Sequence, residues 1–233
     1  MISDDGFFFE VKENYGPEMV TAFIRLNGMT VGCVANRTEV LDEENEKTAE
    51  YEPVLGARGC DKAAEFVSFC DAFNIPVLAL VNVKGYKQSK CTERRIAKAA
   101  GRLTYAFANA DVPKVTVVIG EAYGSAYVTM NSKSIGADIV YAWPDAKIGM
   151  MDAAAAVKIM YAEEISASDK AAALISEKAA EYEALQSSAA AAAGRGYVDD
   201  IIKADETRQR VIAAFEMLFT KREGRPSRKH GTV

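Results

Sequence analysis

The hydrophobic pattern divides the first sixty residues into paired strands and a polar segment. Two apolar-rich stretches, Met19 to Leu26 and Thr30 to Ala35, flank Asn27-Gly28, a dipeptide that tolerates the positive φ angles of a tight turn. This arrangement predicts a β-hairpin. From Glu39 to Glu52 the chain is strongly acidic and loses its periodicity, which predicts a surface loop, and residues 56–59 are interpreted as the turn that follows.

Further along the chain, helical and strand-like patterns alternate. The predicted elements are a helix from Asp61 to Phe73, a strand from Pro76 to Val83, a helix from Thr92 to Ala110, a strand from Pro113 to Gly120, a helix from Ala126 to Ile135 and a strand from Ala137 to Trp143. Strands separated by helices of this length pair in parallel through right-handed crossovers, so the sequence predicts an α/β layered fold.

Composition narrows the class of protein. The 233 residues, 49% of them hydrophobic, are typical of one globular domain. We expect a single domain over 1–233, with an acidic surface loop at 41–52, an alanine-rich helical region at 152–220 and a basic tail at 221–233. The net charge of −5 argues against a nucleic-acid partner, and no apolar run approaches the ~20 residues of a membrane span. The four cysteines show no paired spacing, which favours reduced thiols in a cytoplasmic protein.

The sequence offers few side chains for acid–base catalysis or metal binding. Its one histidine, His230, lies near the C-terminus, which argues against a histidine triad, and no metal site is expected. Two segments, 83–86 and 120–127, have the form of a buried strand that ends in a glycine turn and enters a helix. The backbone N–H groups of such a turn can form an oxyanion hole, each donor contributing ~3–4 kcal/mol to a transition state. Small residues at a helix entry also serve close packing, so both interpretations stay open.

Many separated runs, in the same order and spacing, resemble one family, the biotin-dependent acyl-CoA carboxyltransferases. The runs are FVSFCDAFNIP (66–76), YAFA (105–108), VPKVTV (112–117), AYGSAY (122–127), GAD (136–138), YAWP (141–144), RGYVD (195–199), KRE (221–223) and KHG (229–231). The family includes the β subunits of propionyl-CoA and acetyl-CoA carboxylases and the carboxyltransferase subunits of methylmalonyl-CoA and glutaconyl-CoA decarboxylases. The resemblance extends from about residue 5 to residue 231.

This resemblance implies a crotonase-like α/β fold and half of an active site. Subunits of the family contain two such domains: the N-terminal one holds the acyl-CoA and the C-terminal one holds biotin. The present chain is similar to the C-terminal domain, so a CoA-binding half is expected on a separate chain or in an N-terminal domain outside this sequence. No Met-Lys-Met biotinylation motif is present, so biotin is expected on a carrier protein. A homo-oligomer is also implied.

The resemblance also assigns residues to the biotin site. The backbone N–H groups of Ser125 and Ala126 correspond to the family's oxyanion hole, which holds the ureido oxygen while the biotin nitrogen takes the α-proton of the acyl-CoA. The cofactor-contacting positions are Gly85, Tyr86, Gly124 and Tyr127, and Val128 corresponds to a position in the acyl pocket. One departure from the family is Lys84-Gly85-Tyr86, which replaces Pro-Gly-Phe.

Other functions stay open at this point. A crotonase-type hydratase or isomerase needs a carboxylate over the acyl pocket, and Glu121 and Asp152 are the nearest candidates. A non-catalytic scaffold of a carboxyltransferase complex is the second alternative, because the changed segment Lys84-Gly85-Tyr86 is where loss of activity would show. The acyl group and the direction of the reaction, carboxylation or decarboxylation, are not decided by the sequence.

Overall fold

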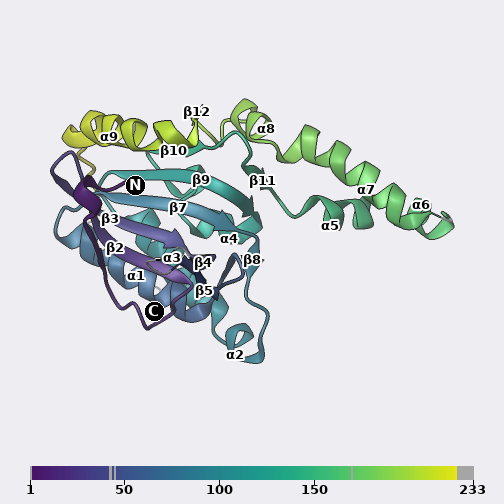
Figure 1. Cartoon of the computed structure of the whole chain (residues 1–233), viewed down its shortest axis with the longest axis horizontal. Coiled ribbons are helices and arrows are strands. Elements are labelled where there is room, and N and C mark those ends of the chain that lie inside the picture. The colour runs from purple at the N-terminus through teal and green to yellow at the C-terminus, as the bar shows by residue number, and fades with distance from the viewer. Residues whose placement is uncertain (1, 42–43, 45, 169, 225–233) are drawn as a thin grey trace.

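The chain folds around one mixed β-sheet flanked by helices (Figure 1). The computed structural model describes residues 2–41, 44, 46–168 and 170–224. The strands follow the spatial order β1 (Phe8–Glu10), β2 (Met19–Leu26), β3 (Met29–Asn36), β7 (Val77–Val83), β9 (Lys114–Tyr123), β10 (Ile139–Ala142) and β12 (Asp200–Ile201), and β11 (Lys147–Gly149) also pairs with β9. From β3 onward the neighbouring strands pair in parallel, as the alternating pattern predicted.

The predicted hairpin is confirmed. Strands β2 and β3 pair antiparallel over their whole length, with Leu26 opposite Met29. The two connecting residues, Asn27 and Gly28, have φ angles of 51° and 78°. Two consecutive positive φ angles are what a type I′ hairpin turn requires, and Asn and Gly are the residues that adopt them most readily.

Alternation along the parallel strands builds a core on each face of the sheet. In β7, Val77, Ala79 and Val81 belong to a cluster with α1 (Ala57–Ala72) and α3 (Ile96–Asn109). Leu78 belongs to a second cluster, on the face covered by α9 (Thr207–Met217). Strands buried on both faces read as continuous apolar runs, which is why the sequence identified them. The sheet is thus held between α1 and α3 on one side and α9 on the other (Figure 1).

Three predicted helices have different bounds in the structure. Helix α1 begins at Ala57, so the predicted turn at 56–59 is its first turn. The predicted helix at 92–110 is divided into α2 (Lys90–Glu93) and α3. The predicted helix at 126–135 is the shorter α4 (Gly124–Thr129), because Asn131 has a φ of 58° and bonds through its side chain to Thr116. Thr116 Oγ1 also donates to the Asn131 carbonyl, and such side-chain bonds to non-helical backbone end helices that hydrophobic spacing alone would continue.

The acidic segment is not a structureless loop. Strand β4 (Glu39–Leu41) pairs antiparallel with β5 (Lys47–Glu50), and the Lys47 amine lies 3.1 Å from the Glu39 carboxylate. The sequence did not predict this hairpin, because most of its side chains are charged or exposed. Only Val40 and Ala49 are partly buried, too few to give an alternating pattern. Beyond it, β6 (Val54–Leu55) pairs in parallel with β8 (Gly85–Tyr86).

The alanine-rich region forms the predicted helices, and part of it leaves the body. Helices α5 (Ala153–Met160), α6 (Ala162–Ala167) and α7 (Ala171–Tyr182) form an arm that extends away from the sheet (Figure 1). A π-helical turn (Glu183–Ser187) and α8 (Ala189–Gly194) lead back to it. None of the described helices is long and apolar enough to cross a membrane.

The basic tail is described only at its beginning. The Lys221 amine lies 2.9 Å from the Asp138 carboxylate and donates to the Val112 carbonyl, so the tail starts in a fixed position against the body. Residues 225–233, which include His230, lie outside the described residues.

Candidate functional site

The turn from β9 into α4 requires a glycine. Gly124 has a φ of +59°, a left-handed conformation that side-chain-bearing residues adopt only with strain. A Cβ atom at this position would lie 3.0 Å from the Met150 carbonyl oxygen. The backbone at the start of α4 is therefore fixed in a shape that a larger residue would disturb.

Contacts between β7 and β9 position the end of β9 before this turn. The register of the two strands shifts between Val81 and Val83, and the Asn82 side chain fills the shift. Its Oδ1 accepts a hydrogen bond of 3.0 Å from the Glu121 N–H and would lie 2.7 Å from a Cβ at Gly120. Gly120 thus allows the close approach that directs residues 121–123 into α4.

The first turn of α4 offers backbone donors. The N–H groups that open a helix have no partner one turn earlier, and no side chain caps this helix at Tyr123. Ser125 is exposed and Ala126 is buried, with 1% of its surface accessible. The predicted donors therefore lie at the boundary between core and solvent.

A hydroxyl network holds α4 against its neighbours. Thr129 Oγ1 donates to the Ser125 carbonyl at 2.9 Å and accepts from Thr104 Oγ1 at 3.2 Å. The Tyr86 hydroxyl lies 3.2 Å from the same Thr129 oxygen. Since the single Thr129 proton is used on Ser125, Tyr86 is the donor in that contact. The structure thus brings the two predicted glycine segments together, and Gly85 lies half-buried in β8 beside Tyr86.

Two other predicted site residues differ in their accessibility. Tyr127 is 7% exposed and packs in the core. Its hydroxyl is buried without a hydrogen-bond partner, and this burial raises the pKa of Tyr127 to about 12. Val128 is partly buried on the same short helix.

Both carboxylates that a hydratase would need are engaged elsewhere. The Glu121 carboxylate lies 3.1 Å from the Lys84 amine. Asp152 accepts hydrogen bonds from the N–H groups of Ala154 and Ala155 and so caps α5. Within the described part of the chain, no three or more His, Cys, Asp or Glu residues gather in a way that could hold a metal ion.

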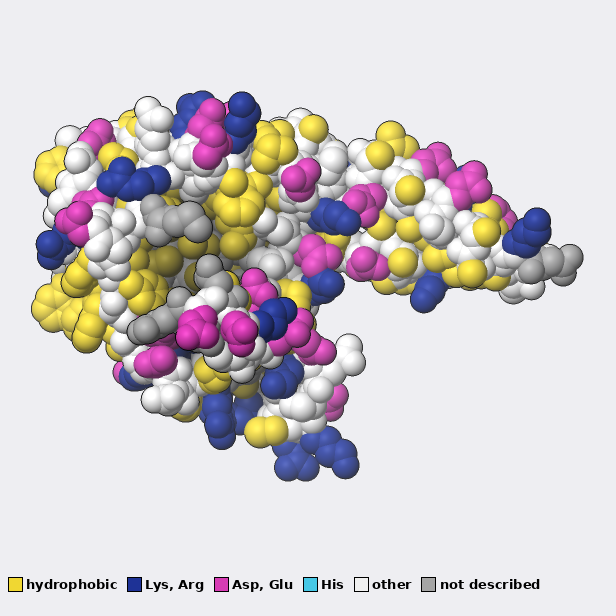
Figure 2. Space-filling model, in the orientation of Figure 1, with side chains coloured by type: hydrophobic (Ala, Val, Ile, Leu, Met, Phe, Trp, Pro, Cys, Tyr) yellow, Lys and Arg dark blue, Asp and Glu magenta, His cyan; other side chains and the backbone are white. Residues whose placement is uncertain are grey.

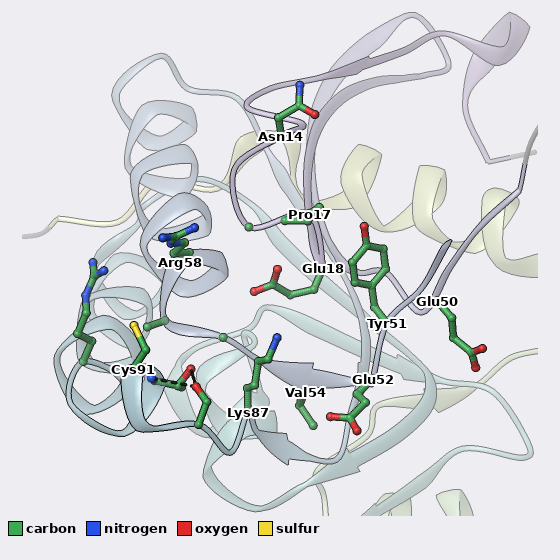
Figure 3. Close-up of a pocket in the computed structure, with 16 residues that line it drawn as sticks. Asn14, Pro17, Glu18, Glu50, Tyr51, Glu52, Val54, Arg58, Lys87 and Cys91 are labelled. Carbon is green, nitrogen blue, oxygen red and sulfur yellow. Dashed lines mark hydrogen bonds between the residues drawn. The ribbon is translucent and has the colours of Figure 1, made fainter. Parts of the chain in front are cut away.

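A cavity of about 620 Å³ lies beside these elements, and sequence reasoning did not identify it. Glu18, the start of α1 and the segment after β8 contribute to its wall, and Figure 3 shows Glu18 and Lys87 pointing into it. The Glu18 carboxylate would lie 2.4 Å from a Cβ at Gly56, so a larger residue before α1 would displace the Glu18 side chain. The signal in the sequence was the glycine pair Gly56 and Gly59, interpreted there as a turn.

Comparisons with known proteins agree on the family. The family model for the carboxyl transferase domain matches residues 1–233. The chain is 42% identical to the methylmalonyl-CoA carboxyltransferase 12S subunit of Propionibacterium freudenreichii subsp. shermanii, over 99% of this chain and 42% of that protein. It is 40% identical to the methylmalonyl-CoA decarboxylase subunit alpha of Propionigenium modestum, over 100% of this chain and 43% of that protein. The chain thus spans less than half the length of these relatives.

Solved structures confirm the fold. The transcarboxylase 12S structure, described as a hexamer assembly with methylmalonyl-CoA bound, matches with a TM-score of 0.89 at 42% identity, over 99% of this chain and 43% of that one. The β subunit of Pseudomonas aeruginosa geranyl-CoA carboxylase, at 22% identity, shares the fold with a TM-score of 0.77 over 100% of this chain and 43% of that one. The expected crotonase-like α/β fold is confirmed, and the chain belongs to the carboxyl transferase domain family.

Proposed function

We propose that this chain supplies the biotin-side half of an acyl-CoA carboxyltransferase active site. The observation that carries the proposal is the Gly124 turn, whose left-handed φ opens α4 with the N–H groups of Ser125 and Ala126. The turn fits a ureido oxygen, because Gly124 places no side chain beside the donors and Ser125 is exposed. Family membership over all 233 residues supports the carboxyltransferase part of this proposal.

In this function the chain contributes backbone chemistry. Bound biotin supplies the carboxyl group and the ring nitrogen that exchanges it with the α-carbon of an acyl-CoA. The Ser125 and Ala126 N–H groups donate to the ureido oxygen and stabilise its negative charge, each by ~3–4 kcal/mol. The network from Thr129 to Tyr86 and Thr104 keeps these donors in place. No side-chain acid or base of this chain enters the proposal.

The other half of the site comes from outside this sequence. The chain spans 42% and 43% of the two relatives compared above, so the CoA-binding half is proposed on a separate chain or in a domain outside this sequence. Biotin arrives on a carrier protein. None of the four cysteines, all of which the structure describes, forms a disulfide, which supports a location in the reducing cytoplasm.

The arm supports the proposed homo-oligomer. Helices α6 and α7 contain no buried residue, while Ile159 and Met160 at the end of α5 are 68% and 62% exposed. Large apolar side chains gathered on an extended element mark an interaction surface. The 12S relative forms a hexamer, and we propose that the arm packs against another copy of this chain.

The hydratase alternative loses support, because its candidate acids are already bound to Lys84 and to the start of α5. The acyl group stays open, and the partly buried Val128 is the residue of this chain that we propose lines its pocket. The relatives include both a carboxyltransferase and a decarboxylase, so both directions are candidates.

Decarboxylation of malonyl-, methylmalonyl- and glutaconyl-CoA with free biotin tests the proposal. The chain, a CoA-binding half and the two together form the three arms of the assay. We expect turnover only when both are present, and the substrate with the highest kcat/KM identifies the acyl group. Turnover by the chain alone, or neither turnover nor biotin binding in any arm, would overturn the half-site assignment.

A further inference from the structure

Basic side chains gather on the segment that follows β8. Residues 84–98 contain six Lys or Arg and one Glu, a local balance of +5 in a chain of net charge −5. The segment includes α2, which stands out from the body (Figure 1), and Lys and Arg side chains surround that projection in Figure 2. We call residues 87–98 the basic knob.

Most charges of the basic knob lack a partner. Arg95 lies 3.3 Å from the Asp61 carboxylate. Lys87, Lys90, Arg94 and Lys98 are exposed and form no ion pair with any residue that the structure describes. Unpaired like charges this close together repel one another, so the cluster costs stability unless an outside anion uses it.

The basic knob is also connected to the candidate site. It follows directly after Tyr86, whose hydroxyl bonds to Thr129 in α4, the helix that carries the Ser125 and Ala126 donors. A molecule held on the knob is therefore held on the segment that continues directly from Tyr86 of the candidate site.

The surroundings favour a macromolecule over a free phosphate group. A polyphosphate needs a concave site of one charge sign, but the cavity next to the knob also includes Glu18, Glu50 and Glu52 in its wall. Lys87 lines that cavity, whereas Lys90, Arg94 and Lys98 lie outside it on the exposed surface of the knob. Such charges act on a second protein over a Debye length of about 8 Å and raise its rate of association.

We propose that the basic knob is the docking surface for an acidic face of the carrier protein that delivers biotin. This inference rests on the proposed carboxyltransferase function. The rest of the chain is acidic and would repel such a carrier, so a positive surface beside the site gives the carrier both attraction and position.

The test uses the assembled enzyme and two forms of biotin. The variant Lys90→Glu, Arg94→Glu, Lys98→Glu reverses the charge, and the matched control Lys90→Arg, Arg94→Lys, Lys98→Arg keeps it. We expect kcat/KM for a biotinylated carrier domain to fall about tenfold to a hundredfold in the reversed variant only. With free biotin, kcat/KM stays unchanged. Raised salt lowers the wild-type value for the carrier, because it screens the attraction, and raises the value of the reversed variant, because it screens the repulsion.

Calorimetric binding of the same carrier domain gives a second readout that needs no turnover. Neutralising its surface carboxylates is expected to reproduce the loss on wild-type enzyme. An equal loss with free biotin, a raised KM for acyl-CoA or an unchanged carrier affinity would overturn the docking proposal. Absence of turnover with free biotin in the wild type would instead contradict the proposed function, while the calorimetric result still decides on docking.

Discussion

The body and the arm use apolar residues in opposite ways. In the body, Val77, Leu78 and Ala79 of β7 are completely buried between α1 and α9. In the arm, α6 and α7 bury no residue, and Ile159 and Met160 at the end of α5 lie mostly in solvent. The body thus has a core of its own, whereas the helices of the arm bury only Ala153, Ala156 and Val157 of α5 and leave large apolar side chains in solvent. We propose that another copy of this chain covers these side chains, so that folding and assembly depend on separate parts of the sequence.

Charge in the arm's apolar surface is expected to have the largest effect. The pair Ile159→Glu and Met160→Glu would place two carboxylates in the proposed contact between copies. We expect the dissociation constant of the assembly to rise about a thousandfold or more, measured by sedimentation velocity. The matched control is Met217→Glu, a 67% exposed residue on the body, which should leave the assembly intact. Equal dissociation of the assembly by both variants would contradict the proposal that the arm, and not the body, forms the contact between copies.

Truncation of leucine in the two regions compares them directly. Leu103 in α3 is 0% exposed and Leu185, at the base of the arm, is 64% exposed. We expect Leu103→Ala to lower the free energy of unfolding by about 2–5 kcal/mol, because it leaves a cavity in the core. Leu185→Ala should change it by less than about 0.5 kcal/mol in the dissociated chain. Urea denaturation measures both, and similar losses would show that the arm also has a packed core.

Within the body, the site differs from its surroundings in requiring one backbone conformation. Gly124→Ala adds a Cβ 3.0 Å from the Met150 carbonyl at a φ of +59°. Displaced donors are expected to lower kcat about a hundredfold to a thousandfold with little change in KM. Gly101→Ala is the control, since a Cβ there meets no atom within 4 Å. An unchanged kcat in Gly124→Ala would contradict the assignment of the donors.

The smallest expected effect compares buried and exposed cysteines. Burial raises the pKa of Cys33, Cys60 and Cys70 from 9.0 to about 12, while Cys91 is exposed. Iodoacetamide at pH 8 should therefore label one thiol in the folded protein and four in urea, as counted by mass spectrometry. Since folding raises the pKa of these three thiols, their contribution to the free energy of unfolding is fully present below pH 9, where they are protonated in both the folded and the unfolded chain. It is lost between pH 9 and 12, by about 1.4 kcal/mol per thiol and pH unit. Rapid labelling of all four would contradict this burial.

The sequence predicted those parts of the fold in which local pattern and tertiary packing agree. The Asn27-Gly28 hairpin and the buried strands β7 and β9 were predicted because turn residues and continuous apolar runs are local signals. The early start of α1 was missed, because two glycines three residues apart, Gly56 and Gly59, indicate a turn by local pattern. The short strands β6 and β8 were missed because two residues carry no periodicity.

In the candidate site, too, features with a local sequence signal were predicted and features that depend on tertiary contacts were not. The glycine at 124 is visible in the sequence, and its left-handed conformation agrees with the predicted turn. The bond between Tyr86 and Thr129 joins residues 43 positions apart and could not be read from spacing. The burial of Tyr127 was not predicted, because it arises from a six-residue helix that packs one of its faces against the sheet, and its assignment to the cofactor stays a prediction.

A crystal or cryo-electron microscopy structure of the assembled enzyme with biotin bound would test the central claim most directly. The quantity to measure is the distance from the ureido oxygen to the backbone nitrogens of Ser125 and Ala126. We predict both distances to be about 2.7–3.1 Å, with acyl-CoA held by a different domain. An acyl-CoA thioester oxygen on these two nitrogens, or biotin bound away from α4, would contradict the assignment of this chain as the biotin-side half.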